Sequence, residues 1–245
     1  MEAELRTAHD MQVGLMPASA PRVEGLDIAG RCQTANHVGG DFFQYYTLQG
    51  GRLAVCTADV TGHAMEAAIP VVLFSGILES QMEREPGLEA LFAGLNHSMC
   101  RVLQRRTFVC FAMVEVEPGR LRVANAACPP AYLFRAASGT VEEMLSETYP
   151  LGVSARSSYP IAEVPLGPGD RLVLCSDGIV EAQSEAGELF GYERTMEAVR
   201  AGCERGLGAS ALLDELFATV EAFCGSAPVT DDRTCVVVGV GEQTS

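Results

Sequence analysis

The sequence predicts an α+β fold in which antiparallel sheets are covered by helices. Strand-like segments, with aromatic and β-branched residues on either side of glycine turns, follow one another in a hairpin pattern. Segments rich in Ala, Leu, Met and Glu come in pairs between and after the strand-rich stretches. With 245 residues, of which 48% are hydrophobic, the chain can bury a core, and one domain is the simplest count.

The first strand-rich stretch begins at LDIAGRCQTA and continues through GGDFFQYYTL, a turn at residues 49–51, and RLAVCTADV. Two helices are expected next, from about Met65 to Arg84 and from Gly87 to Arg105. The second strand-rich stretch comprises TFVCFAMVEVE, GRLRVANAA, PPAYLFRAA and SGTVEEML, and GDRLVLCSD has the apolar run of a central buried strand.

The two ends of the chain have different patterns. Loops are expected after Ser176, then a short helix near Tyr192–Ala201, a longer one near Ala209–Phe223, and a closing strand TCVVVGV. Residues 2–16 are expected to form a helix that ends before the prolines at 17 and 21. This helix could pack on its own domain or pair with another helix. Its apolar stripe consists of Leu5, Ala8, Met11 or Gln12, and Leu15.

Composition excludes several function classes. A net charge of -15 argues against a nucleic-acid partner and against anionic lipid surfaces. No apolar run is long enough for a membrane span. The nine cysteines are scattered, without zinc-site spacing, and several lie in apolar runs. This pattern predicts free thiols in a reducing cytoplasm.

Aspartates recur at the ends of hydrophobic strand-like segments, next to glycine or a polar turn. Asp41 precedes FFQYY, Asp59 ends LAVCTAD, Asp177 ends RLVLCSD, and Asp231-Asp232 precede the last strand. Hard cations such as Mg2+ and Mn2+ prefer oxygen ligands, and rigid strand ends can hold carboxylates at fixed separations. Each element alone is more often an ordinary turn, so only the ordered set points to a metal site.

As a set, GGDFF, ADVTGHAMEAA, NAACPPAYL, PLGV, SDGIVEA and DDRTCVVV resemble the bacterial type 2C (PPM) phosphatases, in particular the SpoIIE/RsbU-like group. The resemblance covers nearly the whole chain. It implies a β-sandwich of two antiparallel sheets flanked by helices, with two Mn2+ or Mg2+ ions at one end of the sandwich. It also implies hydrolysis by a metal-activated water, without a phosphoenzyme.

The resemblance assigns roles to individual residues. Asp59 would bridge both metals, and the backbone carbonyl of Val60 would bind one of them. Asp177 and Asp231 would bind the second metal. Asp41 would act on the metals, either directly or through a water molecule. Asp232 is a less certain metal ligand. The predicted catalytic residues are Asp41, Asp59 and Asp177.

The resemblance also implies partners. Its bacterial members act on phosphoserine or phosphothreonine of small STAS-type anti-sigma-factor antagonists. Residues 1–20 would then form a linker or regulatory helix that joins a sensor domain or a dimer partner, and residues 21–245 would form the phosphatase domain.

The sequence departs from the family pattern at three positions. Gln44 stands where a second acid is common, Ala64 replaces a glycine, and Cys128 falls where a histidine is usual. These departures leave a second hypothesis open, a catalytically weak pseudophosphatase that binds a phosphoprotein. A lone histidine such as His63 is more often a structural residue than a catalytic acid. A nucleotide cyclase built on GGDFF is a weaker third hypothesis, because such a site would not also need the later SDG and DD motifs.

Overall fold

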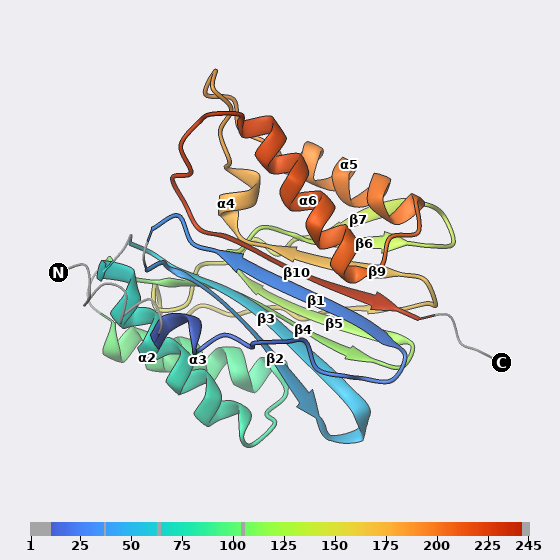
Figure 1. Cartoon of the computed structure of the whole chain (residues 1–245). Helices are drawn as coiled ribbons and strands as arrows, with labels where there is room; N and C mark the ends of the chain where they lie inside the picture. Colours follow the sequence, from blue (N-terminus) through green and yellow to red (C-terminus); the bar gives the residue numbers. More distant parts are fainter. Residues whose placement is uncertain (1–10, 37, 63–64, 104–105, 242–245) are drawn as a thin grey trace.

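Within the part of the chain that the computed structural model describes, residues 11–36, 38–62, 65–103 and 106–241, two five-stranded antiparallel sheets lie face to face (Figure 1). In spatial order, the first sheet contains β1 (Leu26–Gln33), β10 (Arg233–Val240), β9 (Arg171–Cys175), β6 (Ala131–Arg135) and β7 (Thr140–Met144). The second contains β2 (Asp41–Leu48), β3 (Arg52–Val60), β4 (Val109–Glu117), β5 (Arg120–Ala126) and β8 (Ala162–Pro165). The predicted α+β sandwich is confirmed.

Helices cover the outer face of each sheet, which gives four layers (Figure 1). The first sheet is covered by α4 (Asp177–Val180), α5 (Gly191–Glu204) and α6 (Ala209–Cys224), and the second by α2 (Met65–Met82) and α3 (Leu88–Val102). None of the described helices is both long and apolar enough to cross a membrane.

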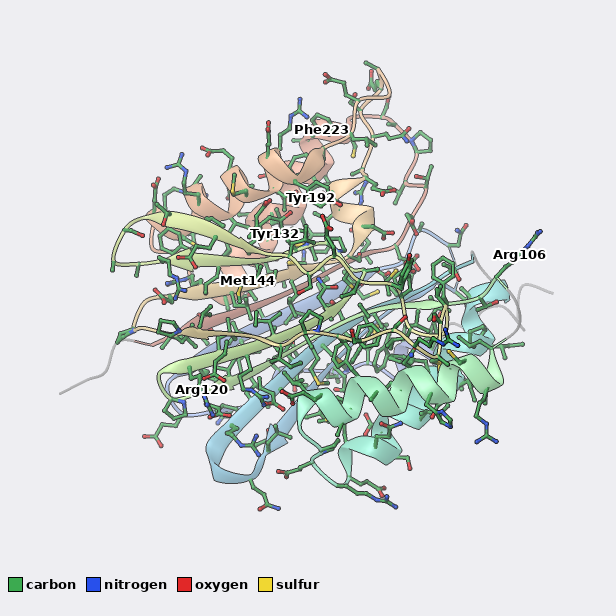
Figure 2. All side chains as sticks on the ribbon, turned by 180° about the vertical axis from the view of Figure 1, so that it is seen from behind. Arg106, Arg120, Tyr132, Met144, Tyr192 and Phe223 are labelled. Carbon is green, nitrogen blue, oxygen red and sulfur yellow. The ribbon has the colours of Figure 1, made fainter. Side chains whose placement is uncertain are left out.

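Strand alternation divides the core into three apolar layers. Phe42 packs against α2 and α3, whereas the next residue, Phe43, packs between the two sheets. Tyr132 packs in the layer beneath α5 and α6, and Figure 2 shows it on the sheet side of Phe223. Successive strand residues point to opposite faces, so a run such as LAVCTAD can fill two layers at once.

Two elements of the structure were not predicted from the sequence, and some element boundaries differ from those expected. The short strand β8 was not predicted, and the segment after Ser176 forms the helical turn α4 rather than a loop. The two helices expected to end at Arg84 and Arg105 end at Met82 and Val102, and residues 104–105 lie outside the described part. The segment GDRLVLCSD is confirmed as a central strand, because β9 is the middle strand of its sheet.

The predicted N-terminal helix lies largely outside the described residues. Of its described residues, 11–16, residues 11–13 are helical and 14–16 form a turn, and Leu15 and Met16 pack against the core. Of the two residues expected as alternatives on the apolar stripe, Met11 is 69% exposed, whereas Gln12 is buried. The end of this segment therefore packs on its own domain.

Phe111 lies at the centre of the layer beneath α2 and α3. Its ring centroid is 5.2 Å from that of Phe74 and 5.0 Å from that of Phe92, and the side chain is fully buried. We expect Phe111→Ala to lower the free energy of unfolding by about 3–5 kcal/mol, because the cavity cannot collapse in a sandwiched layer. Urea unfolding would measure it, with the exposed Tyr149→Ala as control. A loss equal to that of the control would contradict this packing.

Candidate metal centre

The β2–β3 hairpin places two of the predicted aspartates opposite each other. Asp41 opens β2, and its register partner in β3 is Asp59. Because Phe43 and Val55 face the layer between the sheets, Asp41 and Asp59, each an even number of residues away, face the same layer. Like charges directly opposite each other on neighbouring strands are unfavourable, so this pair needs compensation.

The other sheet brings the remaining aspartates to the same end of the sandwich, on the left in Figure 1. Cys175 of β9 pairs with Cys235 of β10, and the strands continue outward to Asp177 and to Asp231-Asp232. A Cβ atom on Gly178 would lie 1.8 Å from the backbone oxygen of Asp232, so only glycine allows these two turns to touch. Asp177 and the Asp231-Asp232 pair therefore start from adjoining turns.

Asp232 connects the two sheets. It is 4% exposed, and its Oδ2 accepts hydrogen bonds from the backbone N–H groups of Gly40, at 2.7 Å, and Asp41, at 3.4 Å. Its Oδ1 accepts a third from Ala35, at 2.8 Å. Asp232 thus holds the turn that leads into β2, while its role as a metal ligand stays a prediction.

The carboxylates act on one another electrostatically. Burial, then the charges of Asp177 and Asp231, raises the pKa of Asp59 to about 8. Burial and the charge of Asp59 raise the pKa of Asp41 well above the usual aspartate range. Burial and Asp231 raise the pKa of Asp177 to about 6. Four of the five predicted ligand side chains, Asp41, Asp59, Asp177 and Asp231, thus share one electrostatic site, where a bound cation would stabilise their charged forms.

The donor set fits a hard divalent cation. Asp41 Oδ2 and Asp177 Oδ1 are buried and accept no hydrogen bond. A Cβ on Gly40 would lie 2.6 Å from the carbonyl oxygen of Val60 and 2.9 Å from Asp59 Oδ1, so any larger residue at this position would crowd both oxygens. Among the described residues, no three His, Cys, Asp or Glu side chains are already gathered as a finished metal site. The fit therefore rests on oxygen chemistry and excess negative charge.

Two of the unusual residues in the motifs have clear positions. Gln44 donates to the carbonyl of Leu15, at 3.3 Å, and accepts from the N–H of Tyr45, so its hydrogen bonds do not go to the aspartates. Cys128 lines a cavity of about 20 Å3 together with Cys110, Asp59 and Asp177. Burial raises the pKa of the Cys128 thiol, which keeps this wall of the site neutral. His63 and Ala64 lie outside the described residues.

Sequence reasoning missed three residues around the aspartates. The side chains of Ser176 and Thr234 act on Asp41 from the other sheet and oppose the rise of its pKa. The N–H of Thr234 also donates to Ser176 Oγ, at 2.9 Å. Glu181 follows Asp177 by one turn of α4, and its charge contributes to the raised pKa of Asp177. The signal for all three was their place within the SDGIVEA and DDRTCVVV motifs.

Comparison with known proteins identifies proteins that this chain resembles. The sequence pattern of the family described as Stage II sporulation protein E (SpoIIE) matches residues 49–241. Protein IcfG of Synechocystis sp. is 24% identical over 229 residues, which cover 81% of this chain and 36% of IcfG. The phosphoserine phosphatase RsbU of Bacillus subtilis is 23% identical over 191 residues, which cover 77% of this chain and 57% of RsbU. The chain thus spans only part of the length of these relatives.

Solved structures share the fold. The SiaA-PP2C domain of Pseudomonas aeruginosa superposes with a TM-score of 0.83 at 24% identity, over 97% of this chain and 95% of that domain. The catalytic domain of the serine/threonine protein phosphatase PstP, in complex with two manganese ions, gives a TM-score of 0.63 at 18% identity, over 89% of this chain and 99% of that domain.

Replacing Asp59 by asparagine removes a buried charge that its surroundings disfavour. We expect metal-free Asp59→Asn to melt higher than the unaltered protein, by roughly 2–4 °C for each kcal/mol relieved. The gain should grow from about pH 4 to about pH 8, because the unfolded chain releases this proton near pH 4 but the folded protein only near pH 8. Calorimetry with a chelator at several pH values would measure it. A gain that does not change with pH would contradict the charge assignment.

Asp232 should stabilise the fold, whereas Asp231 should mainly stabilise bound metal. Asp232→Ala leaves three backbone N–H groups without their acceptor, so we expect a loss of about 3 kcal/mol in unfolding free energy. Asp231 is exposed, and Asp231→Ala should cost about 1 kcal/mol or less while it weakens Mn2+ binding. Urea unfolding and calorimetric titration would separate the two. Equal stability losses would contradict this division of roles.

Proposed function

The chain belongs to the SpoIIE family, and we propose that it is a metal-dependent protein serine/threonine phosphatase. The observation that carries the proposal is the convergence of Asp41, Asp59, Asp177 and Asp231 at one end of the sandwich, where burial and mutual repulsion raise the pKa of three of them. Such clustering is unfavourable for folding alone, and sites of this kind are typically functional.

The proposed ligands come from both sheets. Asp59 and the carbonyl of Val60 lie at the end of β3, and Asp177 and Asp231 lie beside β9 and β10. Two Mn2+ or Mg2+ ions held there would supply Lewis-acid chemistry, by lowering the pKa of a water molecule and neutralising charge on a phosphoryl group. The manganese ions named in the PstP structure support this assignment for the fold.

The chain's own residues orient this site. Ser176 and Thr234 act on Asp41 from the opposite sheet and favour its charged form, and Asp232 fixes the backbone before it. The apolar wall at Cys128 limits water on one side. These contacts set the carboxylates in place before a cation or substrate arrives, which is the preorganisation that hydrolysis of a phosphate ester requires.

We propose a phosphoserine or phosphothreonine protein as substrate, specifically a STAS-type anti-sigma-factor antagonist. Support comes from RsbU, a phosphoserine phosphatase whose match covers 77% of this chain. The nine free cysteines support a cytoplasmic location, because free thiols persist in reducing compartments. An upstream sensor or a second copy, joined through the N-terminal helix, would regulate such a domain.

Phosphate release from a phosphoserine peptide tests the proposal. We expect turnover with Mn2+ that a chelator abolishes, and a fall of at least about 100-fold in kcat/KM for Asp177→Asn. The matched control is Asp214→Asn, an exposed aspartate of α6 that pairs with Arg31. Turnover without metal, or unchanged turnover in Asp177→Asn, would contradict the proposal. Tight binding of a phosphoprotein with no turnover would support the pseudophosphatase instead.

A further inference from the structure

Gln12 is the one described residue of the helical turn 11–13 that faces the protein interior. Its side chain is 4% exposed, whereas its neighbours Met11 and Val13 are 69% and 46% exposed. A buried glutamine is uncommon, because its amide must find hydrogen-bond partners inside the protein. The partners of Gln12 are therefore informative.

Both ends of the Gln12 amide bind the same residue of the metal-site turn. Nε2 donates to the carbonyl of Gly39 at 2.5 Å, and Oε1 accepts from the N–H of Gly39 at 2.9 Å. A side-chain amide carries one acceptor and two donors, so it can satisfy both groups of a single peptide residue. This pairing fixes the orientation of the turn as well as its position.

Gly39 is two residues before Asp41, within the turn that the two sheets hold. The N–H of Gly40 donates to Asp232, and the carbonyl of Gly40 accepts from the N–H of Val60 at 3.0 Å. These bonds come from Asp232, directly before β10, and from Val60 of β3, whereas the bonds to Gly39 come from the helical turn 11–13. Gly39 is buried, so loss of Gln12 would leave a buried N–H and a buried carbonyl without these partners.

We propose that Gln12 is a positioning residue through which docking of the helical turn 11–13 sets the metal-binding geometry of Asp41. The proposal rests on the proposed function, because it concerns the same site. Gln44 and the apolar contacts of Leu15 keep the segment on the domain, but they do not bind the turn. Gln12 alone among these residues transmits the helix position to Gly39. Loss of the contact between Gln12 and Gly39 would free the turn before Asp41 and weaken metal binding.

Two variants remove the amide in the full chain. Gln12→Met keeps the length and burial of the side chain, and Gln12→Ala removes both. The controls are Met11→Ala and Val13→Ala, exposed neighbours on the same helical turn. The measurements are hydrogen exchange of peptides covering residues 38–43 in the metal-free protein, and Mn2+ affinity by calorimetric titration.

For folded Gln12→Met we expect faster exchange across the turn and Mn2+ affinity about 10-fold weaker or more, as when a residue that orients a ligand is lost. The controls should remain within about twofold of the unaltered protein in both measurements. A variant that only melts lower, with exchange and Mn2+ affinity equal to the controls, would overturn the proposal and leave Gln12 a structural residue.

The two proposals fail in different ways. If the unaltered protein neither binds Mn2+ nor releases phosphate, the proposed function fails. The exchange measurement needs no metal, so it still decides the link between Gln12 and Gly39: unchanged exchange in both Gln12 variants would overturn it. If Gln12→Ala does not fold, Gln12→Met carries the comparison.

Discussion

Carboxylates of like charge are held together between two apolar sheets, and the arrangement of the rest of the molecule follows from that constraint. Asp41 and Asp59 are register partners whose side chains face the buried layer, and Asp177 adds charge from the other sheet. Burial and repulsion both disfavour their ionised forms. Three apolar layers offset this cost, and a bound divalent cation would turn repulsion into attraction.

The backbone around the aspartates is fixed from several directions. Asp232, at the start of the last strand, accepts three N–H groups from the turn before β2, and Gln12 binds the same turn from the N-terminal helix. The ion pairs of Arg120 with Glu117 and Glu163 lie at the turn between β4 and β5, at the opposite end of β4 from Val109, the register partner of Val60; Figure 2 shows Arg120 at this turn. The arginine of these ion pairs is exposed, so the pairs stabilise little, whereas Asp41 and Asp232 at the metal end are buried.

Much of this could be predicted from the sequence where local patterns determine structure. Alternation around the glycine turn at residues 49–51 predicted the β2–β3 hairpin, whereas the pairing of Asp41 with Asp59 across it came from the structure. The apolar run RLVLC gave a central strand. The weak strand β8 escaped prediction, because four half-exposed residues ending in proline have no clear strand pattern.

Long-range polar contacts were beyond the reach of the sequence. Nothing in the spacing of Gln12 and Gly39, 27 residues apart, or of Gly40 and Asp232, 192 apart, indicates that they bond. These links depend on how the two sheets and the N-terminal segment pack, not on local propensity. The same holds for Gln44, which stands where a second acid is common in the family and whose side-chain amide donates to the carbonyl of Leu15.

Anomalous diffraction at the manganese absorption edge, from crystals grown with Mn2+, is the most direct test of the metal centre. The proposed site predicts two peaks at the end of the sandwich where β3 and β9 end, within reach of the carboxylates of Asp59, Asp177 and Asp231. Peaks elsewhere, or none at this end in an otherwise well-ordered crystal, would contradict it.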